Sequence, residues 1–196
     1  MTFDSITQDD RLWATRYEGC SDNALDTLFD QWNDVAWLRE FFKANLDDLI
    51  SYFKITDVND AIYDTIEDSE RLQCLIMDIS PEADLDKLFR PLENSRFTDI
   101  LLGKEKARLK DTVRHASWLR IYAIKLEPGI YVITGGAIKL TRTMQEREHT
   151  LQELGKMEKV RNFLLEQGIV DREAFIDYMS ELSWKYVKED VVYILI

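Results

Sequence analysis

Three basic residues gather where a predicted strand passes into a predicted helix. They are Lys139, Arg142 and Arg147. Between them, residues 143–146 (Thr-Met-Gln-Glu) have the T-x-x-E pattern of a capping box, which predicts that a helix begins at about Met144. A cationic corner at which a strand turns into a helix suits the binding of a phosphate group.

The strand that leads into this corner is the second strand of a predicted β-hairpin. Residues 118–126 and 130–141 are rich in aromatic and β-branched side chains. The segment 127–129 between them is Glu-Pro-Gly, in which proline fixes φ and glycine accepts a positive φ, so it predicts the turn. Gly135-Gly136 inside the second strand predicts a bulge or a close approach of the backbone to a neighbour.

The rest of the chain predicts helices around this hairpin. Apolar residues recur at helical spacing over the first hundred residues, although the segment 57–77 fits either a helix or a buried strand. After the basic corner, a long helix is expected to end before Gly168, and Asp171 is expected to cap a second one. The apolar run at 191–196 predicts a last strand of the sheet, because an exposed run of this composition would aggregate.

The predicted fold class is therefore α+β, and the charge divides the chain in the same place as the elements. Residues 1–90, the expected acidic and mainly helical layer, hold 21 acidic and 8 basic side chains. Residues 91–170 hold 10 acidic and 14 basic side chains, although the whole chain has a net charge of -12. We expect an acidic helical region at 1–90 and a domain of antiparallel sheet and flanking helices at 91–196, as two regions or as one compact unit.

Several functional classes find no support in the sequence. No apolar run approaches the length needed to cross a bilayer, and acidic residues stand at the N-terminus where a secretory signal would be basic and then apolar, so we expect a cytoplasmic protein. The two cysteines, Cys20 and Cys74, have no metal-binding spacing, which predicts two buried, reduced thiols. No glycine motif of a nucleotide-binding loop occurs.

The order of segments around the hairpin carries a family resemblance. An apolar stretch, LDKLFRPLEN, is followed by a basic segment, the strands WLRIYAIKL and GIYVITGGAIKL, and then TRTMQEREHTLQEL, which opens a helix. Over about residues 85–154 this order resembles the RelE/ParE toxin superfamily, nearest its HigB-type branch. Arg120 stands where the strand arginine of that family stands, and Lys139, Thr141 and Arg142 stand in its basic turn, although Leu140 replaces the second lysine of the family's pair.

This resemblance implies the toxin component of a type II toxin-antitoxin system, with a RelE-like fold whose basic face binds mRNA on the ribosome and cuts it. A cognate antitoxin is the implied protein partner, and no metal or other cofactor is implied. The ribose 2′-hydroxyl would attack the adjacent phosphorus while the enzyme supplies proton transfer and charge stabilisation. Arg120, Lys139 and Arg142 are the candidates for charge stabilisation, and His115 is the candidate general acid or base. The candidates for nucleic-acid binding are Arg108, Lys110, Arg114, Thr141 and Arg147.

Two other interpretations use the acidic first ninety residues. In one, the chain is a non-catalytic acidic interaction protein, such as an antitoxin-like, immunity or phage-derived inhibitor that binds a basic partner. In the other, the acidic helices lie across the basic face as a built-in antitoxin. The charge distribution alone does not decide between them, and it leaves the oligomeric state open.

Overall fold

The predicted hairpin lies at the centre of the sheet in the computed structural model of the chain, which describes residues 1–92, 101–109 and 114–193, with the side chains of 183–193 left out. Strands β5 (Leu119–Glu127) and β6 (Ile130–Ile138) pair in antiparallel fashion. Gly129, in the turn between them, has a φ of 79°. The hairpin and its turn are confirmed.

The hairpin belongs to a six-stranded sheet of order β1-β2-β6-β5-β4-β3. All neighbouring strands are antiparallel except β2 and β6, which run parallel, so the mixed α and β class is confirmed. The four other strands are β1 (Thr2–Ser5), β2 (Leu12–Arg16), β3 (Phe89–Pro91) and β4 (Gly103–Ala107).

The expectation that the first ninety residues are mainly helical missed β1 and β2. Leu12 and Ala14 pack into the core on one face of the sheet, while Phe3 and Trp13 pack into the core on the other. β2 is buried on both faces and therefore shows no alternation of apolar and polar residues, so its periodicity does not distinguish it from a piece of helix. β1 has only four residues, of which one is buried. The expected division between residues 90 and 91 falls inside β3.

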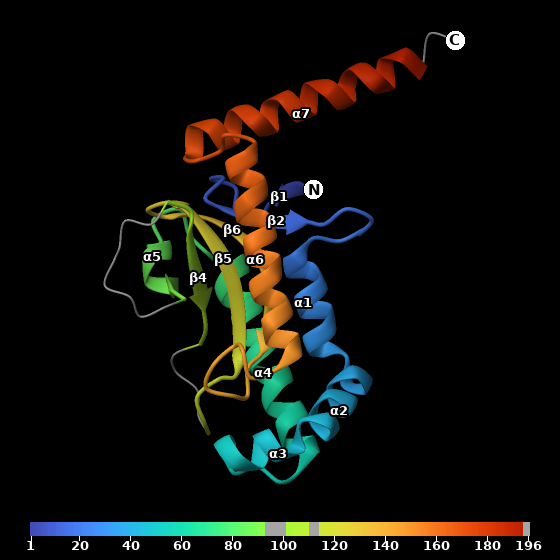
Figure 1. Ribbon diagram of the computed structural model, residues 1–196, viewed down its shortest axis with the longest axis vertical. Coiled ribbons are helices and arrows are strands. Elements are labelled where there is room, and N and C mark those ends of the chain that lie inside the picture. The colour runs from blue at the N-terminus through green and yellow to red at the C-terminus, as the bar shows by residue number, and fades with distance from the viewer. Residues whose placement is uncertain (93–100, 110–113, 194–196) are drawn as a thin grey trace.

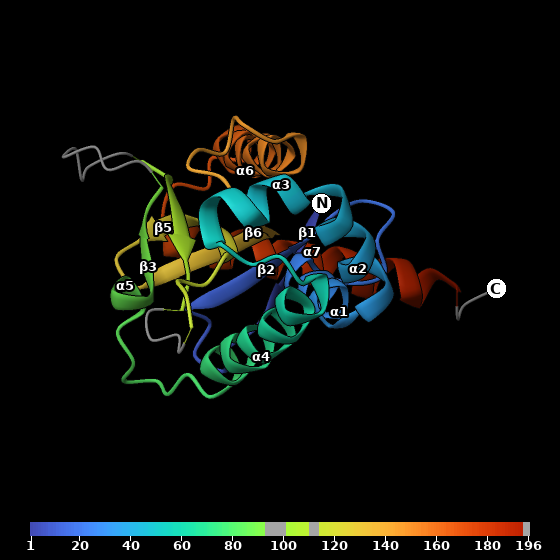
Figure 2. The ribbon, with the colours of Figure 1, turned by 90° about the horizontal axis from the view of Figure 1, so that it is seen from below.

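Helices cover both faces of the sheet. Figure 2 shows α6 on one side, the strands in the middle, and α1 and α4 on the other side. The segment 57–77, which the sequence left open, is helix α4 and packs with α1 and α2. The helical segments are α1 (Ala24–Asn33), α2 (Val35–Ala44), α3 (Leu46–Asp48), the π-helical η1 (Leu49–Phe53), α4 (Val58–Met77), α5 (Leu85–Leu88), α6 (Glu148–Glu166) and α7 (Arg172–Tyr193).

The C-terminal part of the chain agrees with the sequence prediction in two places and differs in two. Gly168, with a φ of 72°, follows the end of α6 as predicted, and Asp171 accepts from the Ala174 N–H at 2.9 Å at the start of α7. However, α6 begins at Glu148 rather than at Met144, because Met144 is buried in the core and the segment up to Arg147 stays a loop. The expected last strand is wrong for residues 191–193, which belong to α7; residues 194–196 lie outside the described part of the chain.

Figure 1 shows how the remaining parts are arranged. Helix α6 runs along the long axis of the molecule, and α7 crosses its far end and extends past the body. Cys20 and Cys74 are unpaired as predicted but exposed, so the prediction of burial was wrong. Among the helices of the described residues, none has the length and apolar character needed to cross a membrane.

The two adjacent glycines of β6 are required by close packing from both sides. The register between β5 and β6 shifts beside Tyr122, which leaves Thr134 as a bulge next to Gly135. A Cβ on Gly135 would collide with the Glu153 carboxylate of α6. A Cβ on Gly136 would collide with the Arg120 carbonyl oxygen and lie 2.8 Å from Leu28 Cδ1 of α1. Both predicted features, a bulge and a close backbone approach, are present.

We therefore expect Gly136→Ala to destabilise the fold by about 1–3 kcal/mol, because a backbone oxygen and a core side chain must both shift. The matched control is Gly155→Ala in α6, where the glycine is exposed and has nothing within 4 Å of the added Cβ. This control is expected to stabilise the protein by about 0.5–1 kcal/mol, since alanine is the better helix former. Urea denaturation measures both; equal stability of the two variants would contradict the packing described for β6.

Candidate anion-binding site

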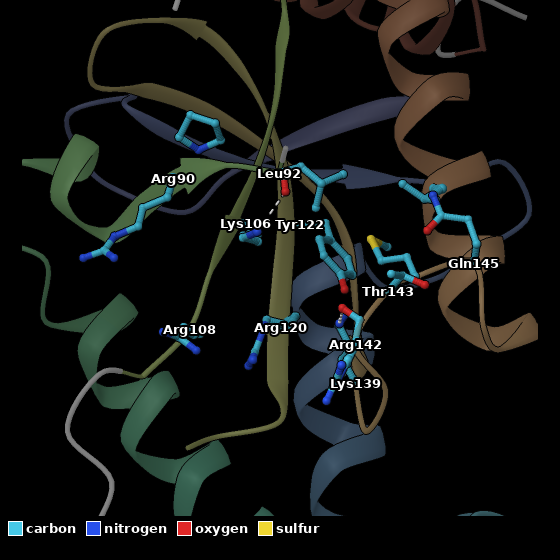
Figure 3. Close-up of a pocket in the computed structure, with 13 residues that line it drawn as sticks. Arg90, Leu92, Lys106, Arg108, Arg120, Tyr122, Lys139, Arg142, Thr143 and Gln145 are labelled. Atoms are coloured by element: carbon cyan, nitrogen blue, oxygen red, sulfur yellow. Dashed lines mark hydrogen bonds between the residues drawn. The ribbon is translucent and has the colours of Figure 1, made fainter. Parts of the chain in front are cut away.

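A hollow of about 800 Å³ opens on the face of the sheet that α6 covers, and we call it the basic hollow (Figure 3). Its walls come from β3, β4, β5, the end of β6, the loop 142–145 and Leu154 of α6. The residues of the lining that carry no charge include Tyr122 and Met144, which belong to the core beneath α6. The basic residues of the lining are Arg90, Lys106, Arg108, Arg120, Lys139 and Arg142.

The strand register brings these cations to one face. Lys106 of β4 pairs with Tyr122 of β5, and Arg120 of β5 pairs with Ala137 of β6. Because side chains two residues apart on a strand share a face, Arg120 lies on the same face as Tyr122, and Lys139 follows Ala137 on that face. Arg120, Lys139 and Arg142, the three residues that the sequence suggested for charge stabilisation, all line the basic hollow.

The six cations form two tiers that differ in exposure. The inner tier, Lys106, Arg120 and Lys139, is partly buried, and the outer tier, Arg90, Arg108 and Arg142, is exposed. Among the described residues, the side chains of the inner tier donate their hydrogen bonds to backbone carbonyls. Lys106 Nζ donates to Leu92 O at 2.8 Å, Arg120 Nη1 to Ser117 O at 2.6 Å and Leu119 O at 2.7 Å, and Lys139 Nζ to Thr141 O at 2.6 Å and Arg142 O at 2.5 Å. Carbonyl groups are neutral, so these bonds hold the side chains in place without cancelling their charge.

No acidic side chain among the described residues neutralises the charge of the six lining cations through an ion pair. None of the six cations forms an ion pair with a described acidic side chain, and residues 1–89 contribute nothing to the lining. Glu146, at the edge of the loop, instead accepts from the Thr143 hydroxyl at 2.8 Å and from the Thr143 N–H at 2.5 Å. The built-in antitoxin interpretation requires acidic helices that lie across the basic face. The acidic helices of the described residues do not line the basic hollow.

Burial and the charges of neighbouring cations lower the pKa of each residue of the inner tier. Burial, and then the charges of Arg120 and Arg108, lower the pKa of Lys106. Burial, and then Arg120, lower the pKa of Lys139. Burial, and then Arg108, lower the pKa of Arg120 to about 10. Because like charges at short range in a partly buried site disfavour the charged form, an anion placed among them would stabilise all three.

The acidic half of the chain pairs with three other predicted site residues. Arg147 bonds Asp48 through two nitrogens, at 2.6 and 2.5 Å, and Asp48 is buried. Arg114 NH1 and His115 Nε2 contact the two oxygens of buried Asp64, at 2.9 and 3.1 Å.

His115 also stacks on Trp118, with ring centroids 4.1 Å apart. None of Arg114, His115 and Arg147 is in the lining of the basic hollow. Thr141 is buried and its hydroxyl donates to Thr143 O at 3.0 Å, so it shapes the loop beneath Lys139. Lys110 lies outside the described residues.

Arg90, Lys106 and Tyr122 are among the lining residues that sequence reasoning missed. Lys106 lies two residues before Arg108, in the alternating pattern Lys104-Glu105-Lys106, which is a signal for a strand with a basic face. Arg90 and Tyr122 carry no comparable local signal, because a long-range strand pairing brings each of them to the site.

No protein-family model, no curated protein and no solved structure matches the chain. Within the described residues there is also no group of three or more His, Cys, Asp and Glu side chains that could hold a metal ion.

The acid on β4 that lies next to Lys106 in sequence points to the opposite face. Glu105 is buried, and burial raises its pKa to about 7, with Lys125 opposing the shift and Asp86 adding to it. An acid whose pKa is higher in the folded than in the unfolded chain favours folding in its protonated form. That contribution is complete below pH 4.5, the pKa of the unfolded chain, and is lost as the pH rises through about 7.

We therefore expect Glu105→Gln to remove part of the pH dependence of stability. Between pH 5 and pH 8 the wild-type protein is expected to lose about 3 kcal/mol through Glu105 that the variant does not lose. Urea denaturation at the two pH values measures this. A stability difference between variant and wild type that is the same at pH 5 and pH 8 would contradict the shifted pKa.

Proposed function

We propose that the basic hollow binds the phosphate backbone of RNA, and that the protein is the toxin component of a type II toxin-antitoxin system. In this proposal it cuts translated mRNA in the cytoplasm and has a cognate antitoxin as its protein partner. The observation that carries the proposal is the cluster of six lining cations that no described carboxylate neutralises. The resemblance to the RelE/ParE superfamily supplies the reaction and the partner.

The chemistry that the basic hollow can support is charge stabilisation during phosphodiester cleavage. The ribose 2′-oxygen bonds to the adjacent phosphorus, the 5′-oxygen leaves, and a 2′,3′-cyclic phosphate remains. Negative charge grows on the phosphate oxygens in the transition state, and preorganised cations stabilise it. Arg120 is suited to this role because its planar group stays charged and holds two oxygens at once.

The reaction also requires that the 2′-hydroxyl loses a proton and that the leaving 5′-oxygen gains one. His115, the candidate from the sequence, lies at Asp64 and Trp118, outside the lining. Lys106 and Lys139 are the lysines of the lining, and burial lowers the pKa of both. Both lysines line the basic hollow and carry exchangeable protons, so we assign proton transfer to them in place of His115.

The alternative of an acidic interaction protein uses a different surface. It places binding on the first ninety residues and gives the basic hollow no role. Two acids of that segment, Asp48 and Asp64, are already buried against Arg147, Arg114 and His115. Substitutions in the basic hollow therefore separate the two functions.

Arg142→Gln and Arg114→Gln form a matched pair for RNA binding. Both remove one exposed guanidinium group, but only Arg142 lines the basic hollow, whereas Arg114 pairs with Asp64. We expect Arg142→Gln to weaken binding of a single-stranded RNA about tenfold at low salt. Its slope of log affinity against log salt is expected to fall by about 0.7, as for the loss of one phosphate contact. Fluorescence anisotropy across a salt series measures both; equal losses in the two variants would count against the basic hollow as the RNA site.

For catalysis we expect induced expression of the wild-type chain to arrest growth and to cleave translated mRNA. Arg120→Ala or Lys139→Ala is expected to slow cleavage roughly a hundredfold or more, since the first removes a group that stabilises transition-state charge and the second a group that transfers a proton. Arg114→Gln serves as the control and is expected to retain the arrest. Primer extension on a reporter mRNA measures the cleavage, after circular dichroism has shown that the variants fold. Cleavage that is unchanged in Arg120→Ala would refute the assignment.

A further inference from the structure

The hydroxyl group of Tyr122 is a buried donor that finds no acceptor in the described part of the chain. The side chain is 0% exposed, and its oxygen has no hydrogen-bond partner among the described residues. Figure 3 shows the ring inside the basic hollow, with the hydroxyl end pointing toward the loop that carries Arg142. Buried hydroxyl groups in folded proteins are nearly always paired, so an unpaired one that faces a cavity indicates a missing ligand.

The surroundings of Tyr122 identify the charge of that ligand. Lys106 is its cross-strand partner, and Arg120 lies two residues before it on the same face of β5. Burial raises the pKa of Tyr122, so the hydroxyl keeps its proton and acts as a donor. A hydroxyl donor that is surrounded by cations can bond an anion, whereas a further cation would be repelled.

Glu153 is a buried acid whose charge acts on Tyr122, but it does not accept a hydrogen bond from the Tyr122 hydroxyl. Glu153 of α6 raises the pKa of Tyr122 through its charge, but its Oε1 accepts from Lys156 Nζ at 2.6 Å. Its other oxygen, Oε2, lies against Gly135 and has no hydrogen-bond partner within the described ranges, although the backbone of Gly136 lowers the pKa of this carboxyl. The two unpaired atoms do not bond each other in the structure, so the Tyr122 hydroxyl remains available.

We propose that the inner tier, together with the Tyr122 hydroxyl, is a site for a single phosphate group. This inference rests on the proposed function, since the phosphate belongs to the RNA backbone. The three inner cations and the hydroxyl surround the two non-bridging oxygens, while the exposed outer tier meets the neighbouring phosphates of the strand. Tyr122 is thus a positioning residue: it adds a hydrogen bond of fixed direction where the cations supply attraction from several sides.

Tyr122→Phe tests this assignment, because it deletes one oxygen and leaves the charge and the ring in place. Without ligand, the variant is expected to be as stable as the wild type or more stable, since it removes an unpaired buried hydroxyl. Its affinity for a fluorescein-labelled single-stranded RNA is expected to fall about tenfold, with an unchanged salt slope, because no cation is lost.

The matched control is Tyr17→Phe on the same face of the sheet. The Tyr17 hydroxyl donates to Thr134 O at 2.6 Å and lies outside the basic hollow. We expect this variant to lose stability and to keep its RNA affinity, which is the reverse of the Tyr122→Phe pattern. Thermal unfolding and anisotropy measured on the full-length proteins give both quantities.

A second probe, inorganic phosphate measured by isothermal titration calorimetry, separates failure of this inference from failure of the proposed function. If RNA does not bind but phosphate binds the wild type more tightly than it binds Tyr122→Phe, the RNA proposal is refuted and the phosphate site stands. If RNA binds the wild type and Tyr122→Phe equally well, or if Tyr122→Phe lowers stability as much as Tyr17→Phe, the phosphate site is refuted. Absence of both phosphate and RNA binding refutes both proposals.

Discussion

The sheet holds three cations side by side in the basic hollow, although their like charges repel one another. Lys106, Arg120 and Lys139 come from three neighbouring strand segments, and their strand register, rather than any opposite charge, sets their spacing. Each is held by bonds to backbone carbonyls, which fix position without neutralising charge. Such a cluster raises the free energy of the fold, and an anion bound among the three cations would relieve this repulsion.

The acidic half of the chain divides the cations into paired and unpaired groups. Asp48 and Asp64 are buried acids of the helical layer. Asp48 pairs with Arg147, and Asp64 contacts Arg114 and His115. Burying a carboxylate without a partner costs free energy, so these contacts stabilise the two buried acids and fix the segments that carry their partners. The six cations that line the basic hollow form no ion pair with a described acidic side chain, and no acid of the first 89 residues belongs to the lining. The net charge of -12 therefore does not describe the potential inside the basic hollow.

The sequence predicted the parts of this protein that local signals determine. The turn at Gly129, the end of α6 at Gly168 and the cap at Asp171 each follow from residue types within a few positions. It did not predict β1 and β2, because β1 is short and has one buried residue, and the burial of β2 on both faces depends on packing against distant segments such as Phe175 of α7. For the same reason it grouped His115 and Arg147 with Arg120: nearness in sequence cannot reveal which cations a distant carboxylate pairs with.

Strand β6 connects the basic hollow to both helical layers. Lys139 follows directly after it, and the Glu153 carboxylate and the Leu28 side chain press on Gly135 and Gly136 from opposite sides. On its outer edge β6 pairs with β2, a strand from the first ninety residues. A fragment that begins near residue 91 would lose β1, β2 and α1 and would expose the core face of β6 to water. The acidic first half therefore acts less as a cover for the basic face than as the support that holds the β6 end of the basic hollow in place.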